Sequence, residues 1–159
     1  MKEKIVIGSD KSGYTLKERL ASWLIAQGYE VEDVGTKDIE NFQPYFEVAP
    51  KAARKVQSGE AKRAILICGT GMGMCIAANK FKGVYAAVVE SVYAARMSAV
   101  VNGANILTLG GWIIAPEMGE KIVEEWLNTP FGEGFPPERV AFLKNARAQV
   151  AASEEANFK

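Results

Sequence analysis

Short segments of largely apolar residues recur along the first two thirds of the chain. Their near-continuous apolar character, without a polar residue at every second position, is typical of strands buried on both faces of a parallel sheet. These segments lie at residues 4–8, 30–34, 64–68, 84–89 and 105–109. The pattern therefore predicts a sheet of about five strands.

Longer segments with helical periodicity separate the predicted strands. They cover residues 13–27, 47–58, 72–80, 91–102 and 116–127. In the first of them, Leu16, Leu20 and Leu24 recur at a spacing that places them on one face of a helix. Regular strand–helix alternation predicts an α/β protein, a Rossmann-like three-layer α/β/α sandwich with a five-stranded parallel sheet.

The alternation stops after Asn128. A turn-rich connector with several prolines and glycines follows, and a last helical pattern begins near Glu138 and runs into the 150s. We interpret residues 1–159 as one domain, in which 129–159 form a connector and a C-terminal helix that contacts a partner subunit. Packing of this helix on its own domain is the alternative.

Composition narrows the class of protein. A chain of 159 residues can bury the core of one domain, and 19 basic residues balance 19 acidic ones, so neither nucleic acid nor an anionic membrane is an expected partner. No apolar run approaches the roughly 20 residues that span a bilayer, and the N-terminus reads as a strand and not as a signal peptide, so we expect a cytoplasmic protein. The chain has no histidine and only two cysteines, which argues against a zinc site.

The carboxyl ends of the predicted strands carry the candidate chemistry, because ligands of open parallel sheets bind there. Cys68 ends one strand, and Gly69, Gly71 and Gly73 follow in a turn that opens a helix. Backbone N–H groups of such a turn and the helix N-terminus can hold a phosphate or an enediolate oxyanion, and their field favours a thiolate. A purely structural interpretation, a small strand residue followed by a tight turn, is the alternative. The spacing of the glycines is not that of a dinucleotide-binding fingerprint.

The loop after the first strand faces the same edge. Asp10 fits either a helix N-cap, as its residue type alone suggests, or a contact to a substrate hydroxyl. Lys11 fits either an anion contact or a solvated surface lysine. We interpret Cys75 as a packing residue, and for Met72 and Met74 helix packing is favoured over lining a pocket. A third strand end carries Glu90 and Ser91.

Several motifs together resemble the ribose-5-phosphate isomerase B / galactose-6-phosphate isomerase family, over roughly residues 4–145. The resemblance rests on the following segments, in chain order: Gly8-x-Asp10-x-x-Gly13 with Leu16-Lys17-Glu18; Gly28-Tyr29-Glu30-Val31-x-Asp33-x-Gly35-Thr36; Cys68-Gly69-Thr70-Gly71-x-Gly73-x-x-Ile76-Ala77-Ala78-Asn79-Lys80; Tyr93-x-Ala95-Arg96; Asn102-x-Ala104-Asn105; and Arg139-Val140.

The resemblance implies an aldose–ketose isomerase that works through a cis-enediolate without metal or cofactor. It also implies a homodimer or homotetramer whose active sites are shared between subunits, and a sugar or sugar phosphate as substrate. By this resemblance Cys68 is the catalytic base and Thr70 acts near the ring oxygen. Some members use a glutamate where this chain has Met74, which favours Cys68. We expect the substrate-binding residues to be Asp10, Lys11, Tyr45, Gly69, Gly71, Met72, Gly73, Asn102 and Arg139.

Other positions depart from the family pattern. Val101 stands where the family has its ring-opening histidine, and Lys11 replaces another histidine. Trp112 and Phe135 stand where two phosphate-binding arginines are expected, so that Arg139 alone remains. We therefore expect a divergent isomerase whose substrate is not ribose 5-phosphate. Open-chain sugars fit this pattern, including a tetrose phosphate, a keto-sugar acid or a free sugar.

Two other classes of function compete with this one. A binding or regulatory module could keep the fold and lose catalysis, and the missing histidine and arginines favour it. A flavodoxin-like nucleotide or flavin binder is the other, and the absent fingerprint argues against it. Retention of a thiol beside the glycine turn favours the enzyme.

Overall fold

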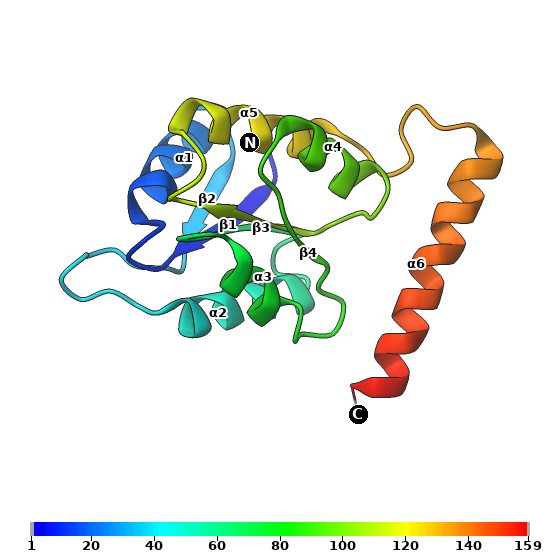
Figure 1. Ribbon diagram of the computed structural model, residues 1–159, viewed down its shortest axis with the longest axis horizontal. Helices are drawn as coiled ribbons and strands as arrows, with labels where there is room; N and C mark the ends of the chain where they lie inside the picture. The colour runs from blue at the N-terminus through cyan, green and yellow to red at the C-terminus, as the bar shows by residue number, and fades with distance from the viewer. Residues whose placement is uncertain (1, 159) are drawn as a thin grey trace.

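The computed structural model describes residues 2–158, and its centre is a five-stranded parallel sheet between two layers of helices (Figure 1). The strands are β1 (Lys4–Ser9), β2 (Glu30–Asp33), β3 (Arg63–Cys68), β4 (Ala86–Val88) and β5 (Ile106–Gly110). The helices are α1 (Tyr14–Ala26), α2 (Tyr45–Gln57), α3 (Met72–Ala78), α4 (Val92–Val100), α5 (Pro116–Asn128) and α6 (Pro137–Asn157). The predicted architecture is confirmed.

The strand order β2-β1-β3-β5-β4 places β3 at the centre of the sheet. In the parallel register Ser9 lies opposite Ile67, and Cys68 lies opposite Gly110. The carboxyl ends of β1, β3 and β5 therefore meet at one edge. The loops that follow these strands are brought together there.

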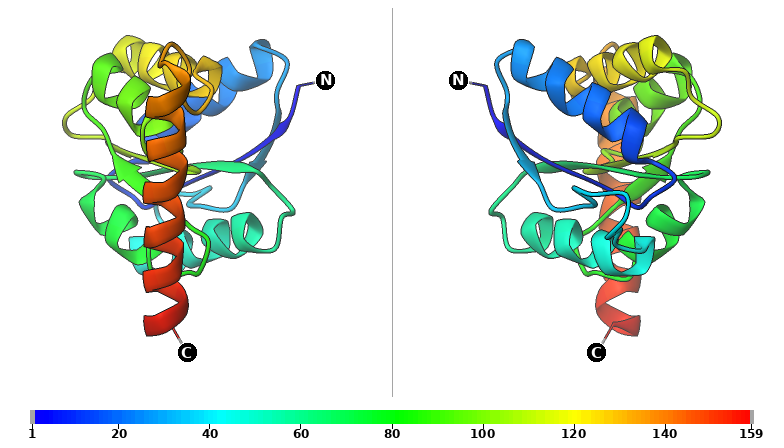
Figure 2. Two further views of the ribbon diagram at one scale, coloured as in Figure 1. Left: turned by 90° about the vertical axis from the view of Figure 1, so that its right-hand side faces the viewer. Right: turned by 90° about the vertical axis from the view of Figure 1, so that its left-hand side faces the viewer.

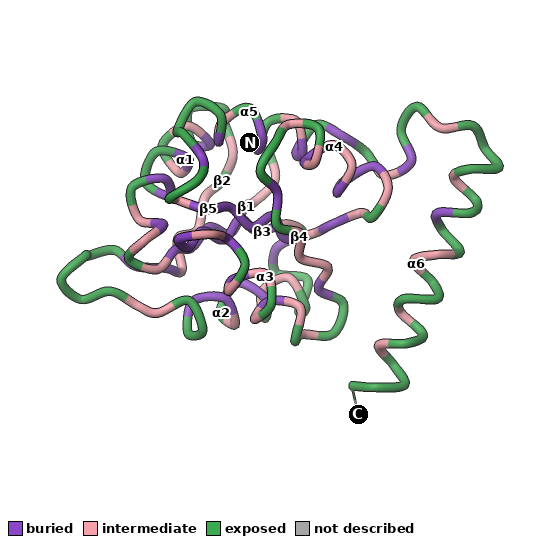
Figure 3. The backbone as a smooth tube through the Cα atoms, in the orientation of Figure 1, coloured by how far each residue is buried: buried purple, intermediate pink, exposed green. Residues whose placement is uncertain are grey.

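Side-chain alternation along the strands divides the core into two clusters. Ile5 and Ile7 pack on the face covered by α1, α4 and α5, whereas Val6 packs on the face covered by α2 and α3. Two views from the sides show these helices above and below the sheet (Figure 2). The strands in the middle of the sheet are buried on both faces (Figure 3), as their apolar sequences predict.

Some predicted boundaries are wrong by a few residues. The predicted strand at 84–89 is reduced to Ala86–Val88 at the sheet edge, and the predicted helix at 72–80 ends at Ala78. The N-cap of α1 is Gly13, without a side-chain cap, so the prediction of Asp10 as N-cap is wrong. The Asp10 carboxylate instead accepts the Gly13 N–H at 3.1 Å, across the loop that precedes the helix.

Helix α6 stands at the side of the molecule and is largely exposed (Figures 1 and 2). Leu143 is its one buried residue among those described. Arg147 stacks between the rings of Tyr85 and Phe131, at 5.6 and 5.1 Å from the centroids, and the Glu154 carboxylate accepts the Gly83 N–H at 2.9 Å. Few contacts therefore fix α6 on its own domain.

No helix within residues 2–158 combines the length and the apolar character that membrane crossing requires.

A buried lysine in α1 is a feature that the hydrophobic pattern does not predict. The Lys17 side chain is fully buried, and its ammonium donates to Asp33 and to the Thr36 carbonyl oxygen, both at 2.6 Å. The exposed Glu18 carboxylate lies 2.6 Å away as well. This group ties α1 to β2 and to the loop after it, which leads to Tyr45.

Candidate active site

Backbone contacts join the loops after β1, β3 and β5. The Asp10 N–H donates to the Ile67 carbonyl oxygen at 3.2 Å, and the Gly111 N–H donates to the Cys68 carbonyl oxygen at 2.7 Å. A Cβ on Gly13 would lie 2.4 Å from the Ile67 oxygen, so only glycine lets the first loop approach the end of β3 this closely. These contacts hold the three loops close together at the carboxyl edge of the sheet.

A cavity of about 220 Å³ lies among these loops. Its lining consists of Asp10, Ser12, Tyr45, Cys68, Gly69, Thr70, Gly73 and Trp112. Most of the residues that the sequence places at one site are therefore neighbours in space. Ser12 is a lining residue that the sequence analysis missed, although it belongs to the same loop as Asp10.

Cys68 lies at the base of the cavity and is 5% exposed. The N–H of Gly71 points at its sulfur, with a nitrogen–sulfur distance of 3.1 Å. Gly71 has a φ of 80°, in the left-handed region, and this conformation turns its N–H back toward the end of β3. The Met72 N–H donates instead to the Thr70 hydroxyl at 3.3 Å. The turn therefore directs the Gly71 N–H at the sulfur and the Met72 N–H at Thr70.

Replacing Gly71 by alanine tests this geometry. A non-glycine residue in the left-handed region costs about 1–2 kcal/mol, so Gly71→Ala lowers the free energy of unfolding by that amount. We expect it also to lower kcat strongly, because the N–H is displaced from the sulfur and a Cβ would lie 3.0 Å from the Leu109 backbone. Gly59→Ala is the matched control, since Gly59 has a φ of 78° with no atom near its Cβ position. Equal kcat values for the two variants would contradict a role in catalysis for the Gly71 N–H beside Cys68.

Asp10 is half-buried at the cavity wall. Burial raises the pKa of its carboxyl group above the ordinary value of 3.8, and hydrogen bonds from the Gly13 and Ser12 N–H groups oppose the shift. The folded protein therefore binds this proton more tightly than the unfolded chain does. Stability falls as the pH rises through the window between the two pKa values.

Asp10→Asn removes this penalty. Above the raised pKa we expect the variant to unfold at a higher denaturant concentration than the wild type, and this advantage should vanish below pH 3.8. Its turnover should fall at neutral pH if Asp10 contacts the substrate. Denaturant unfolding between pH 3 and pH 7 checks the prediction, and a stability difference independent of pH would contradict it.

Two aromatic side chains, Tyr45 and Trp112, line the cavity. The Tyr45 ring covers Gly73, where a Cβ would lie 3.0 Å from it, and the Trp112 ring covers Gly69 in the same manner at 2.7 Å. Tyr45 and Trp112 are 40% and 74% exposed. Glycines at these positions thus let both rings approach the loop beside Cys68.

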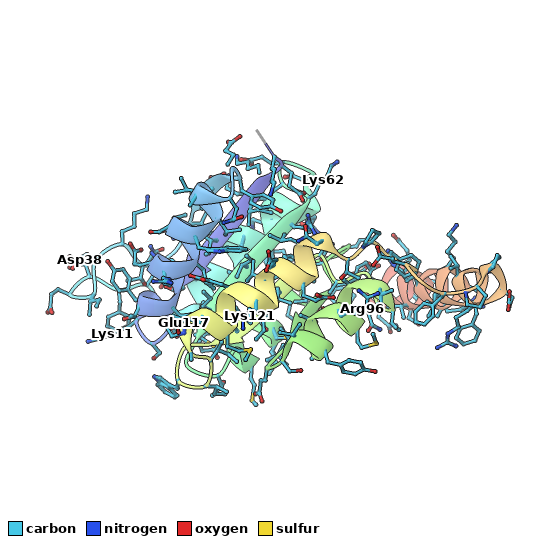
Figure 4. The ribbon with its side chains drawn as sticks, turned by 90° about the horizontal axis from the view of Figure 1, so that it is seen from above. Lys11, Asp38, Lys62, Arg96, Glu117 and Lys121 are labelled. Carbon is cyan, nitrogen blue, oxygen red and sulfur yellow. The ribbon has the colours of Figure 1, made fainter. Side chains whose placement is uncertain are left out.

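Other predicted site residues do not line this cavity. Lys11 lies at the outer edge of the molecule (Figure 4), with its ammonium 5.5 Å above the Phe42 ring. The Met72 side chain is 52% exposed and does not line the cavity, so the prediction that it packs under the helix is wrong, whereas Met74 is buried as predicted. Cys75 is half-buried and donates from its thiol to the Ala86 carbonyl oxygen at 3.3 Å, outside the cavity.

Asn102 and Arg139 line a different hollow. This hollow, of about 260 Å³, lies between α6 and the sheet domain and is also lined by Val101 and Arg147. A single chain therefore presents two separate groups of predicted site residues, one around Cys68 and one beside α6.

The fold and the cavity define an α/β protein with a small polar site at the carboxyl edge of a parallel sheet, equipped with a buried thiol and a glycine turn. Comparison with known proteins identifies the family. The family described as Ribose/Galactose Isomerase matches residues 5–143, so the chain belongs to the ribose/galactose isomerase family. It is accordingly a sugar isomerase of the aldose–ketose type.

Among its relatives, a 4-deoxy-4-sulfo-D-erythrose isomerase of Clostridium sp. (strain MSTE9) is 55% identical, over 98% of each chain. A D-erythrulose-4-phosphate isomerase 2 of Mycolicibacterium smegmatis is 44% identical, over 80% of this chain and 86% of that one. The solved structure of Clostridium thermocellum ribose-5-phosphate isomerase B is similar with a TM-score of 0.88 and 40% identity, over 96% of this chain and 98% of that chain.

Proposed function

We propose that this enzyme interconverts a four-carbon aldose that bears a sulfonate at C4 with the corresponding 2-ketose, and that Cys68 is the base. The observation that carries the chemistry is the buried Cys68 sulfur at the base of the cavity, with the Gly71 N–H 3.1 Å away. The 55% identical relative, named for 4-deoxy-4-sulfo-D-erythrose, supports the substrate.

The proposed reaction is a proton transfer between neighbouring carbons. The Cys68 thiolate removes the proton from C2 of the aldose, and the electron pair moves through C2–C1 onto the C1 carbonyl oxygen, which gives a cis-enediolate. N–H groups of the Gly69–Gly73 turn stabilise this oxyanion. A proton passes from the O2 hydroxyl to O1, and the Cys68 thiol returns its proton to C1. The Thr70 hydroxyl, which lines the cavity, is placed to assist the exchange between the oxygens.

The presence of Val101 supports an open-chain substrate, which needs no acid to open a ring. The family resemblance places a ring-opening histidine at this position, and an apolar side chain cannot transfer a proton. A tetrose with sulfur on C4 has no C4 hydroxyl and cannot close a furanose ring, so it needs no ring-opening acid. A tetrose 4-phosphate has its C4 oxygen blocked and shares this property, and the 44% identical relative is named for such a substrate.

A second copy of the chain completes the site in this proposal. Asn102 and Arg139 lie in the hollow beside α6 and not in the cavity of Cys68, so a sugar in one cavity reaches them only on another subunit. Helix α6 offers exposed apolar side chains for such a contact, with Phe142 at 58% and Val150 at 55% exposure. Arg139 of one copy then binds the anionic end of the sugar that Cys68 of the other copy isomerises.

Turnover measurements on a panel of sugars test the proposed substrate. We expect the highest kcat/KM for 4-deoxy-4-sulfoerythrose, a lower value for erythrose 4-phosphate, and the lowest values for ribose 5-phosphate and unsubstituted erythrose. A clear preference for ribose 5-phosphate would overturn the substrate assignment. Turnover of none of these sugars would favour the binding module instead.

A mixing experiment tests the shared site. Cys68→Ala and Arg139→Ala subunits are each expected to be inactive alone. Random reassortment into dimers gives one intact site in each mixed dimer, so about a quarter of the wild-type activity should return. Unchanged inactivity, with subunit exchange verified by mass spectrometry, would show that Cys68 and Arg139 do not act together across subunits and would overturn the shared site.

A further inference from the structure

Trp112 is an exposed aromatic side chain beside the buried thiol. The Cys68 side chain is 5% exposed at the base of the cavity, and the Trp112 side chain, on the same cavity, is 74% exposed. A substrate whose C1 and C2 lie at Cys68 extends its other end toward the mouth. The indole is therefore placed where the C4 substituent arrives.

Backbone hydrogen bonds fix the turn that carries Trp112. The backbone N–H of Trp112 donates to the Gly69 carbonyl oxygen at 3.0 Å, and the backbone N–H of the preceding Gly111 donates to the Cys68 carbonyl oxygen at 2.7 Å. The ring itself lies on Gly69, where a Cβ would be 2.7 Å from ring atoms. The backbone of Trp112 is thus fixed to the loop that carries the thiol, and its ring packs on that loop.

The cavity contains no cationic side chain from its own chain within the described residues. Its lining includes the Asp10 carboxylate, whereas the nearby Lys11 ammonium lies over the Phe42 ring. An anion that enters beside Trp112 therefore finds an apolar ring and, in the proposed dimer, a single guanidinium from Arg139. One guanidinium neutralises a ligand with a single negative charge better than a ligand with two.

We propose that Trp112 is a specificity-determining residue that contacts the C4 methylene and selects a sulfonate over a phosphate ester. This inference rests on the proposed four-carbon substrate. A sulfonate carries one negative charge, while a phosphate monoester carries about 1.5–2 at pH 7. The neutral indole packs on a methylene but leaves the second charge uncompensated. The ester also extends the chain by one oxygen atom, which brings its anionic group further into the wall.

The test compares kcat/KM for 4-deoxy-4-sulfoerythrose and erythrose 4-phosphate, two sugars with the same carbon skeleton. In Trp112→Arg the ratio should shift toward the phosphate by tenfold or more, equivalent to about 1.4 kcal/mol. Trp112→Lys, a second cationic variant, should shift it in the same direction. Trp112→Phe should keep the wild-type preference. Ile113→Arg is the matched charge control, because Ile113 is 45% exposed in the same turn but does not line the cavity.

A ratio that does not change in folded Trp112→Arg and Trp112→Lys would overturn the inference, as would an equal shift in Ile113→Arg. A wild-type preference for the phosphate would also overturn it, while isomerisation by Cys68 would stand. If the wild type turned over neither tetrose, the proposed substrate would fail, and the inference with it.

Discussion

Replacing Cys68 by alanine is expected to lower kcat about 10³-fold, in the range that a lost general base produces. KM should change little, because the thiol acts on the proton in the transition state and contributes little to substrate binding. The side chain is buried beside the Gly71 N–H, and no second thiol lines the cavity. Steady-state kinetics with the best substrate of the panel gives both constants.

Two further variants separate chemistry from packing. Cys68→Ser preserves the shape of the side chain but offers a hydroxyl that is a far weaker base, so its kcat should be nearly as low as that of Cys68→Ala. Cys75→Ala removes the other thiol of the chain, which lies outside the cavity, and should turn over like the wild type. If Cys68→Ala retained most of the wild-type kcat, the base would have to be another residue.

The second large effect concerns stability and involves Lys17 and Asp33. Removing one partner of a buried ion pair leaves an uncompensated charge and costs about 3–5 kcal/mol. We expect Asp33→Ala to lower the free energy of unfolding by about 3 kcal/mol. This value is the lower limit of that range, because the Asp33 side chain is partly exposed. It also removes the acceptor for the Gly35 N–H, which binds the Asp33 carboxylate at 2.8 Å. Chemical denaturation measures the loss.

A double variant and a surface control make this prediction specific. Lys17→Met with Asp33→Ala removes both charges and keeps an apolar stem in the core, so it should be more stable than Asp33→Ala alone. Glu18→Ala removes an exposed partner of the same ammonium and should cost less than about 1 kcal/mol. Equal losses of unfolding free energy for Asp33→Ala and Glu18→Ala would show that burial of the ion pair does not determine the loss.

The fold could be predicted from the sequence because most of its strands are short apolar runs that differ sharply from the helical segments. The edge strand β4 is shorter than predicted, since Val84 and Val89 are buried apolar residues that extend the run beyond the three residues paired with β5. Lys17 could not be predicted as a core residue, because its burial depends on Asp33 and the Thr36 carbonyl oxygen, which come from distant parts of the chain.

The candidate site could be predicted in part, for a similar reason. Cys68 and the glycines after it form a local pattern, and the topology brings Asp10 and Tyr45 to them. The position of Lys11 depends on its contact with Phe42, which local sequence does not reveal. Asn102 and Arg139 lie in a separate hollow, so only an assembly of chains could bring them to the cavity.

Solvent isotope exchange tests the central claim, proton transfer by Cys68, most directly. The enzyme is incubated in D₂O with 4-deoxy-4-sulfoerythrose over many turnovers, and deuterium is located by NMR. We expect deuterium at C1 of the ketose and at C2 of the recovered aldose with the wild type, and none with Cys68→Ala. Conversion without any deuterium, or exchange by Cys68→Ala at the wild-type rate, would contradict the account.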